Sequence, residues 1–337
     1  PRSAGAYPGP ASYGQGGEQP TVTDANLVLG RLNPDYFLGG EMPLQLERAC
    51  QAIEQFVARP LDLSIEKAAS GIIRVVNANM CRGISVNTTQ KGYDVREFAL
   101  LAFGGAGPLH AVELAQEMGI RRVIVPPFCA VFSALGAVAS DVRHDYVQTI
   151  ALSQTAATTG RLQAAFAALE TQARHQLNQE NVAEDQMIIQ WAADLRYEGQ
   201  SYELTVPLVH NHYLSDEDVQ RLIADFHNLH HRIYAYGDPA EAVEVINVRV
   251  TAIGKVPELS LIRGGEEEHQ PRPKAERPVY FPASGFLSTR IYERAALPAR
   301  QQIAGPCLVE EPTSTTVIPP GASATVDGYG NLVIDIG

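Results

Sequence analysis

Basic residues are scarce in this sequence. The 337 residues include 26 lysines and arginines against 38 aspartates and glutamates, for a formal net charge of −12 at pH 7. The sequence contains no run rich in lysine or arginine. A chain this acidic is poorly suited to electrostatic binding of nucleic acid or of an anionic lipid surface. We therefore expect neither nucleic acid nor membranes among its partners.

Cysteine is sparse as well. The four cysteines, Cys50, Cys81, Cys129 and Cys307, form no C-x-x-C pair, and their spacing fits no zinc ribbon or zinc finger. Dispersed cysteines in a long chain are typical of buried thiols in a reducing compartment. The sequence therefore predicts a cytoplasmic protein.

Long uncharged runs are nearly absent. The one exception, Val123 to Ser140, has 18 residues and resembles a membrane span in length. Pro126 and Pro127 interrupt it, and many of its residues are small, so it predicts a buried strand, a turn and a buried helix. We find no secretory signal. The first residue is not methionine, and we expect the chain to begin inside a larger protein.

Several familiar catalytic motifs are missing too. No P-loop, no G-x-G-x-x-G fingerprint and no G-x-S-x-G elbow occurs. What the sequence has is "AFGGAGPLHA" at residues 102–111, between a predicted strand (97–103) and a predicted helix (108–119). A second strand (122–126) follows, which predicts a βαβ unit. Its helix starts near Pro108 and stops at Gly119.

A glycine turn between a strand and a helix N-terminus is suited to binding an anion or a nucleotide. By spacing alone, a tight structural turn explains it equally well. Further helices are predicted at 44–59, 63–85, 132–145, 158–177 and 215–237, the last with a capping box of Ser215 and Asp218 and a stop at Gly237. A strand is predicted at 243–254, short strands from 278 onward, and an exposed linker at 264–277.

Four groups of polar residues have both a functional and a structural interpretation. Asp24 with Asn26 fits either a site for magnesium or phosphate-bound water, or helix capping by Asp24 or Thr23. Asp141, His144 and Asp145 fit either a metal or acid–base cluster or a polar turn after a helix.

The other two groups are expected to be structural. His227 and His231 have a metal-compatible spacing, but we interpret them as surface or helix-packing histidines. Glu310 and Glu311 precede Pro312, and we expect them to end a strand in solvent.

Long blocks of this sequence resemble the A-type subunit of the hydantoinase/oxoprolinase family. They include "GPASYGQGGEQPTVTDANLVLGRL", "NMCRGISV", "KGYDVREFALLAFGGAGPLHA", "SALGAVASDVRHDY", "DLRYEGQSYEL" and "GPCLVEEPTSTTVIPPG". They occur in the family's order, and the resemblance covers the whole chain.

The resemblance implies an α/β fold: an actin-like (ribonuclease H-like) ATPase lobe followed by an α+β, β-rich C-terminal region. The expected divisions are 1–150 for the later part of the ATPase domain, 151–263 for an α+β region and 264–337 for the β-rich region. Residues 133–140 would form the helix that connects the two lobes.

The resemblance also implies an activity. The family's members use ATP, with Mg²⁺ (or Mn²⁺), to phosphorylate the carbonyl oxygen of a cyclic amide such as a hydantoin or 5-oxoproline, and they usually act with a B-type subunit. The expected nucleotide-binding residues are Gly104, Gly105, Ala106, Gly107, Pro108 and His110. Asp24 and Asn26 are the candidates near phosphate and Mg²⁺, and Asp141 with His144 is a weaker metal candidate.

One departure concerns the front of the chain. The D-x-G-x-T phosphate loop of such ATPases is absent from this sequence, so we expect a chain that lacks the first lobe and turns over little ATP alone. Two alternatives stay open: a β-type subunit of an ATP-dependent ketone carboxylase, and a non-catalytic assembly module that docks a B-type subunit.

Overall fold

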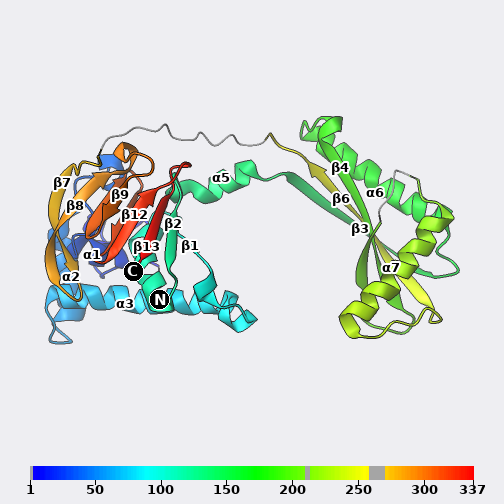
Figure 1. Cartoon of the computed structure of the whole chain (residues 1–337), viewed down its shortest axis with the longest axis horizontal. Helices are drawn as coiled ribbons and strands as arrows, with labels where there is room; N and C mark the ends of the chain where they lie inside the picture. Colours follow the sequence, from blue (N-terminus) through cyan, green and yellow to red (C-terminus); the bar gives the residue numbers. More distant parts are fainter. Residues whose placement is uncertain (1–2, 209–212, 258–269) are drawn as a thin grey trace. The chain divides into compact units, whose positions relative to one another are not determined.

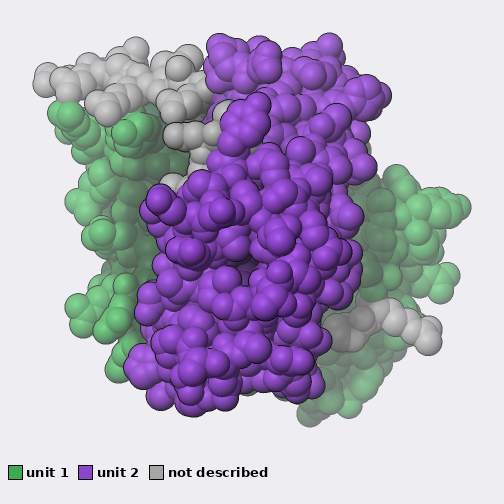
Figure 2. Space-filling model, turned by 90° about the vertical axis from the view of Figure 1, so that its right-hand side faces the viewer, with its two compact units in different colours: residues 1–136, 260–337 green, residues 137–259 purple. Residues whose placement is uncertain are grey.

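The computed structural model describes residues 3–208, 213–257 and 270–337. These residues form two compact units (Figure 2). Unit 1 combines Pro1–Gly136 with Ser260–Gly337, and unit 2 comprises Ala137–Leu259. The strands after residue 270, expected as a region of their own, share unit 1 with the N-terminal segment. The division at 150 and 263 stays a prediction about domains, and part of the expected linker lies outside the described residues.

Unit 1 contains helices and two sheets (Figure 1). Its α-helices are α1 (Val22–Val28), α2 (Leu46–Ile53), α3 (Ile65–Asn87) and α4 (Gly107–Met118), and α5 (Phe132–Ala139) continues past its boundary. Its strands are β1 (Leu100–Leu101), β2 (Arg122–Val125), β7 (Ala275–Phe281), β8 (Gly285–Glu293), β9 (Gln302–Ala304), β10 (Cys307–Glu311), β11 (Ser314–Ile318), β12 (Ala322–Val326) and β13 (Leu332–Ile336).

The predicted βαβ unit is confirmed. β1 and β2 are parallel, with Leu100 opposite Val123, and α4 makes the crossover between them. Gly119 ends α4 in the left-handed conformation, as expected. The five-stranded sheet has the order β1-β2-β13-β12-β9, so the last strand of the chain pairs with β2 (Figure 1). The second sheet has the order β11-β10-β8-β7.

Helix α4 connects the two hydrophobic cores of unit 1. Its Ala111 and Ala115 pack with buried residues of β2 and β13, such as Val123 and Ile334. Its Leu109 packs instead with the second sheet, beside residues such as Leu308. Because the helix that follows the glycine turn contacts both sheets, the C-terminal strands help to fix the position of that turn.

Some local predictions need correction. Helix α1 begins after Thr21, not at Thr23 or Asp24, because Thr21 and Asp24 form a reciprocal capping box. The strand expected at 97–103 is reduced to two residues, since residues 95–97 form a 3₁₀ turn. The helix expected to run to residue 145 ends at Ala139, has no buried side chain, and is followed by a strand.

Unit 2 is an antiparallel sheet with two helices. Its elements are β3 (Val142–Ser153), α6 (Thr159–Gln179), β4 (Met187–Tyr197), β5 (Leu204–Leu208), α7 (Asp216–Tyr234) and β6 (Val243–Gly254). The strand order is β3-β6-β4-β5, and the core includes Trp191 stacked on Phe166 with ring centroids 4.4 Å apart. The capping box of α7 is confirmed. Ala235, not Gly237, takes the left-handed conformation at its end.

Candidate functional site

The glycine turn joins β1 to α4 and passes close to another part of unit 1. Gly104 has a φ of 82°, where glycine is favoured, and its N–H donates to the carbonyl oxygen of Cys129 at 2.7 Å. A Cβ on Gly105 would lie 3.2 Å from the carbonyl oxygen of Thr313. The turn therefore packs against the loop between β10 and β11, a contact that its spacing in the sequence does not reveal.

The turn forms one wall of a cavity of about 320 Å³ within unit 1. The other walls come from α1, from the segment after it and from the β10–β11 hairpin. Apolar and aromatic lining residues include Tyr13, Leu32, Tyr36, Phe37, Leu38 and Leu109, and polar ones include Asn26, Asn33, Glu310, Glu311 and Ser314. A mainly apolar wall with a few polar groups, at this size, is typical of a small-molecule site.

Two of the predicted nucleotide-binding residues, Gly105 and Ala106, line this cavity. The other four, Gly104, Gly107, Pro108 and His110, are not among its lining residues.

Asp24 is fully buried and holds the N-terminal segment in place. One carboxylate oxygen accepts from the N–H of Ser12 at 2.8 Å. The other accepts from the N–H of Ala11 at 3.2 Å and from the N–H and hydroxyl of Thr21, both at 2.8 Å. Because both oxygens are occupied by these donors, Asp24 has the capping role that the sequence left open, and its geometry does not fit a magnesium ligand.

Asn26 lies on the same helix but lines the cavity. Its side chain is buried, and its Nδ2 donates to the carbonyl oxygen of Val22 at 3.0 Å. Its Oδ1 has no hydrogen-bond partner among the described residues. Asp24 and Asn26 therefore do not act as a pair: one is a structural carboxylate, and the other has a buried amide oxygen with no described partner.

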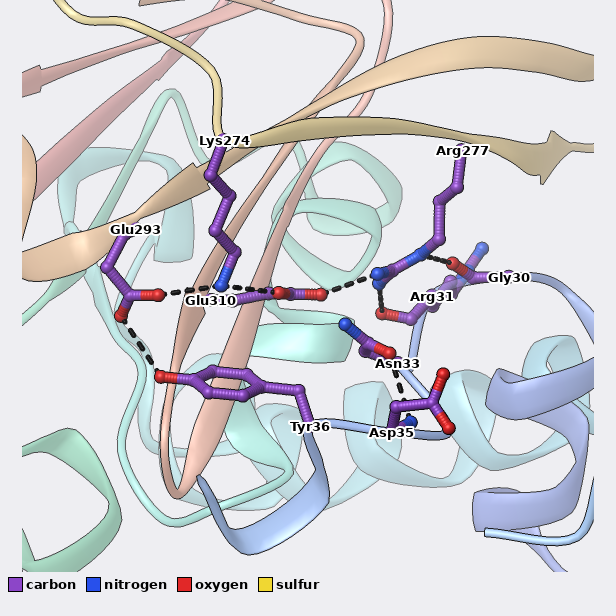
Figure 3. A network of polar contacts seen from close by, with 9 residues as sticks. All are labelled: Gly30, Arg31, Asn33, Asp35, Tyr36, Lys274, Arg277, Glu293 and Glu310. Carbon is purple, nitrogen blue, oxygen red and sulfur yellow. Dashed lines mark hydrogen bonds and ion pairs between the residues drawn. The ribbon is translucent and has the colours of Figure 1, made fainter. Parts of the chain in front are cut away.

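Glu310 was expected to be exposed, and this prediction is wrong. Only 1% of its side chain is exposed, and it lies between two cations (Figure 3). Arg277 Nη1 is 2.6 Å from Oε1, and Lys274 Nζ is 2.9 Å from Oε2. Burial raises the pKa of Glu310, but the bonds from Lys274 and the charge of Arg277 outweigh it and lower the pKa overall.

Lys274 links this ion pair to the cavity wall. Its Nζ is 2.6 Å from Oε2 of Glu293 and 4.0 Å from the centroid of the Tyr36 ring (Figure 3). Tyr36 lines the cavity, so the ammonium supports one of its aromatic walls. Arg277 also donates to the carbonyl oxygens of Gly30 and Arg31, at 2.7 and 3.1 Å. The network ties β7, β8 and β10 to the turn after α1.

Glu311, the next residue, has a different environment. Its Oε1 accepts from the thiol of Cys129 at 3.5 Å and lies 3.9 Å from Nη1 of Arg294. Burial raises the pKa of Glu311, and the charge of Arg294 only partly offsets this. Two adjacent carboxyl groups on one cavity wall thus have pKa values shifted in opposite directions, an arrangement suited to different roles.

His110 is buried and belongs to a polar network within unit 1, whose members do not line the cavity. Asn77 Oδ1 is 2.9 Å from His110 Nδ1, and Asn77 Nδ2 donates to Glu113 at 2.8 Å. The other oxygen of Glu113 pairs with the buried Arg31. Asn77 Oδ1 can only accept, so His110 donates from Nδ1. Burial, followed by the charge of Arg31, lowers the pKa of His110 to about 4.

We expect His110 to make stability depend on pH. An unfolded histidine protonates near pH 6.5, whereas folded His110 resists protonation down to about 4. Between these values the unfolded chain binds more protons, so lowering the pH from 7 to 4 should reduce the unfolding free energy by about 3 kcal/mol through this residue. Urea unfolding at several pH values measures the slope. His110→Gln should flatten it relative to wild type, and the exposed-site control His175→Gln should not; equal slopes in all three proteins would contradict the assignment.

The predicted pair of Asp141 and His144 is not brought together. Asp141 lies just before β3 and His144 lies within it, and the two side chains have different partners. Asp141 pairs with Lys255 at 2.7 Å, and His144 with Glu180 at 2.9 Å. In the part of the chain that the structure describes, no group of three or more His, Cys, Asp or Glu side chains is placed to hold a metal ion. Metal binding by this pair stays a prediction without support from the geometry.

Sequence reasoning missed the wall that the C-terminal strands supply. Thr313 and Ser314 had no assigned role, and neither did Lys274, Arg277 or Arg294. The sequence offered one signal, the apolar run Cys307-Leu308-Val309 directly before Glu310, and in the structure Cys307 to Glu310 are all buried. A continuous apolar run predicts a central strand, whose end need not reach solvent.

Among the described helices, none is both long enough and apolar enough to cross a bilayer.

The chain matches two family profiles. The one described as hydantoinase/oxoprolinase matches residues 1–146, and the one described as hydantoinase/oxoprolinase C-terminal domain matches residues 150–333.

Curated relatives and solved structures agree with these matches. Caprolactamase subunit alpha of Pseudomonas jessenii is 35% identical, over 97% of this chain and 48% of the relative. The crystal structure of that organism's ATP-dependent caprolactamase matches with a TM-score of 0.68 at 34% identity, over 100% of this chain and 50% of the other. 5-oxoprolinase 1 of Arabidopsis thaliana is 30% identical, over 100% of this chain and 27% of the relative.

A nucleotide-free structure of acetone carboxylase, from work on ATP-dependent acetone carboxylation, matches with a TM-score of 0.90 at 27% identity. The match covers 99% of this chain and 49% of the other. The chain thus spans about half of the length of the relatives it matches, or less.

Proposed function

The chain belongs to the hydantoinase/oxoprolinase family, and on that premise we propose that it works in an ATP-dependent enzyme that opens a cyclic amide or imide. The substrate class would be that of hydantoin or 5-oxoproline. The relatives named caprolactamase and 5-oxoprolinase support ring opening as the reaction. The single observation that carries the proposal is the cavity. In this chain, which belongs to the family, the glycine turn, α1 and the β10–β11 hairpin all line it.

ATP would serve this reaction by activating the amide. Transfer of the γ-phosphoryl group to the carbonyl oxygen breaks the bond to ADP and converts an unreactive amide into an electrophile. One water then adds to the carbon and the ring C–N bond breaks, which leaves an amine and an acyl phosphate. A second water hydrolyses the acyl phosphate to the acid and inorganic phosphate. The net products are ADP, phosphate and the ring-opened acid. A divalent cation, Mg²⁺ or Mn²⁺, would accompany the ATP phosphates.

We propose that the cavity holds the nucleoside part of ATP. Its apolar and aromatic lining suits a base and a sugar. Glu310 and Glu311 on one wall would repel phosphates. Asp24 does not fit a metal ligand, so we derive no step through a metal bound by this chain. All four cysteines are free thiols, which fits the cytoplasmic location we propose.

The test is an activity screen of the full-length protein, alone and with its co-expressed partner. ATP is supplied with hydantoin, 5-oxoproline or caprolactam, and both ADP and the ring-opened product are quantified. Stoichiometric formation of the two with one of these cyclic amides is the expected result. ADP formation with none of them, or ring opening without ATP, would refute the proposal.

A second candidate is favoured by one observation, the TM-score of 0.90 to acetone carboxylase. In that case the chain would work in an ATP-dependent ketone carboxylase. Acetone with bicarbonate, as an additional arm of the screen, decides between the two: formation of acetoacetate with ATP consumption and no lactam hydrolysis would select the carboxylase.

We also propose a partner subunit. The names of the relatives, such as caprolactamase subunit alpha and acetone carboxylase beta subunit, describe subunits of larger enzymes. A B-type hydantoinase subunit is the expected partner, and an assembly role is compatible with catalysis. Co-purification of the tagged chain with the co-expressed B-type subunit tests this, and separate elution of the two would count against it.

A further inference from the structure

One end of unit 2 exposes aromatic side chains. Residues 198–203 form the turn between β4 and β5, and residues 233–242 comprise the end of α7 and the loop before β6. These two segments are called the tip of unit 2 below. Of the four exposed tyrosines among the described residues of this unit, three lie in the tip: Tyr202, Tyr234 and Tyr236, with exposed fractions of 80%, 53% and 44%. Exposed tyrosines that gather in one place are typical of a protein interface.

Hydrogen bonds hold the two segments of the tip together. The N–H of Glu198 donates to the carbonyl oxygen of Ala242 at 2.9 Å. His230 is buried and is bound through both ring nitrogens. Its Nδ1 donates to the carbonyl oxygen of Tyr236 at 2.6 Å, and its Nε2 lies 3.3 Å from Oε1 of Gln200. The turn and the loop therefore lie side by side and form one surface.

A second set of contacts fixes the loop on α7. The hydroxyl of Tyr197 accepts from the N–H of Asp238 at 2.9 Å and lies 2.7 Å from Nδ1 of His227. A Cβ on Gly237 would lie 2.7 Å from the carbonyl oxygen of His227, so only glycine fits this close approach. Because the loop is already ordered, a partner would not have to order it on binding, and this favours affinity.

The tip is also acidic. Its two segments contain no lysine, arginine or histidine, and they contain four acids: Glu198, Glu203, Asp238 and Glu241. Among the described residues, only Glu203 of these four has an ion-pair partner, Arg196 at 3.7 Å. Arg232, the nearest basic residue along the chain, lines a different pocket beside Asp225. Carboxylates and the faces of tyrosine rings both attract arginine and lysine side chains, so the tip suits a basic ligand.

We propose that the tip of unit 2 docks a basic segment of the partner subunit, whose arginine or lysine side chains pack on the tyrosine rings and pair with the acids. The inference rests on the partner subunit proposed above. A second copy of this chain is a poorer occupant, because it would place the same four acids against these and like charges repel. The tyrosines would supply most of the affinity, since binding energy is concentrated in a few such residues.

The first arm of the test measures subunit binding with no ATP and no cyclic amide present. Isothermal titration of the full-length protein with the purified B-type subunit compares wild type with Tyr202→Ala and Glu198→Lys. Tyr202→Ala should weaken binding about 30-fold, as is typical of a truncated interface tyrosine. Glu198→Lys should weaken it about tenfold at low salt and less at high salt, because salt screens the charge.

Each variant has a matched control at the other end of α7. Tyr213 is 81% exposed and precedes this helix of 19 residues, which is about 28 Å long. Tyr213→Ala, and Glu217→Lys in the first turn of α7, should leave the affinity unchanged. Equal losses in tip and control variants would overturn the inference, and so would full affinity in the combined Tyr202→Ala and Glu198→Lys variant. Thermal unfolding confirms that each variant is folded.

Failure of this inference can be told apart from failure of the proposed function. Tight binding that no tip variant weakens keeps the partner subunit and overturns the tip as its docking site. Tip-dependent binding without turnover of any tested cyclic amide supports the tip and refutes the ring-opening reaction. Absence of binding by wild type refutes both the partner subunit and the tip. Sedimentation of the protein alone adds one outcome: a dimer that Tyr202→Ala dissociates would overturn the inference and assign the tip to a second copy.

Discussion

Gly105→Val is expected to abolish nucleotide binding and ATP-dependent turnover of the full enzyme. Gly105 lines the cavity, and even a Cβ at this position would lie 3.2 Å from the carbonyl oxygen of Thr313. A valine adds two further carbons that either fill the cavity or push the turn away from the β10–β11 loop. Displacing a binding wall by about 1 Å is enough for a loss of about 100-fold. We expect a loss of at least this size in both nucleotide affinity and turnover.

Two further variants calibrate this result. Gly105→Ala meets only the 3.2 Å contact and should lose several-fold rather than 100-fold. Gly83→Val, in α3, places its new side chain where a Cβ meets nothing within 4 Å and should leave binding unchanged. Titration of ATP and thermal unfolding are measured for all three. Full nucleotide affinity in a folded Gly105→Val protein would mean that the turn is structural and that the nucleotide binds elsewhere.

The βαβ unit around this glycine turn was predictable because its signals are local. The signals lie within one short stretch: an apolar run, three glycines, Pro108 and Gly119. Each of them favours a particular backbone conformation by itself, such as a helix start at Pro108 and a helix end at Gly119. The role of the turn was not predictable, because its neighbour Thr313 is about two hundred residues away in the sequence. Spacing within a motif cannot report which distant loop packs against it.

The same limit explains the error at Glu310. Its burial depends on ion pairs with Lys274 and Arg277, which lie at the start of β7, the first strand of this sheet along the chain. A glutamate before Pro312 has the local pattern of an exposed strand end, and only the pairing of β10 with β8 and β11 shows that this strand is central. The sequence singled out Asp24 and Asn26 as a pair, but only the structure separates a carboxylate with both oxygens bonded from an amide oxygen with no described partner.

Glu310→Ala should cause the largest loss of stability among the predicted variants. The change leaves Arg277 and Lys274 without their shared carboxylate. Breaking a buried ion pair by removing one partner costs about 3–5 kcal/mol, and Glu310 is 1% exposed. The low pKa of Glu310 adds a pH signature: its stabilisation is fully present above the unfolded carboxyl pKa and is lost as the pH falls through the lower folded value. Wild type and variant should therefore converge in acid.

A neighbouring carboxylate provides the control, and the single tryptophan provides part of the readout. Glu293→Ala removes the other carboxylate bound to Lys274, but Glu293 is 29% exposed, so the loss should stay below about 1 kcal/mol. Urea unfolding is followed by far-UV circular dichroism and by the fluorescence of Trp191, the single tryptophan, which lies in the core of unit 2. Glu310→Ala should shift the circular dichroism transition more than the fluorescence transition, because the ion pair lies in unit 1. A loss no larger than that of Glu293→Ala would mean that water screens Glu310 and that this network does not hold the cavity wall together.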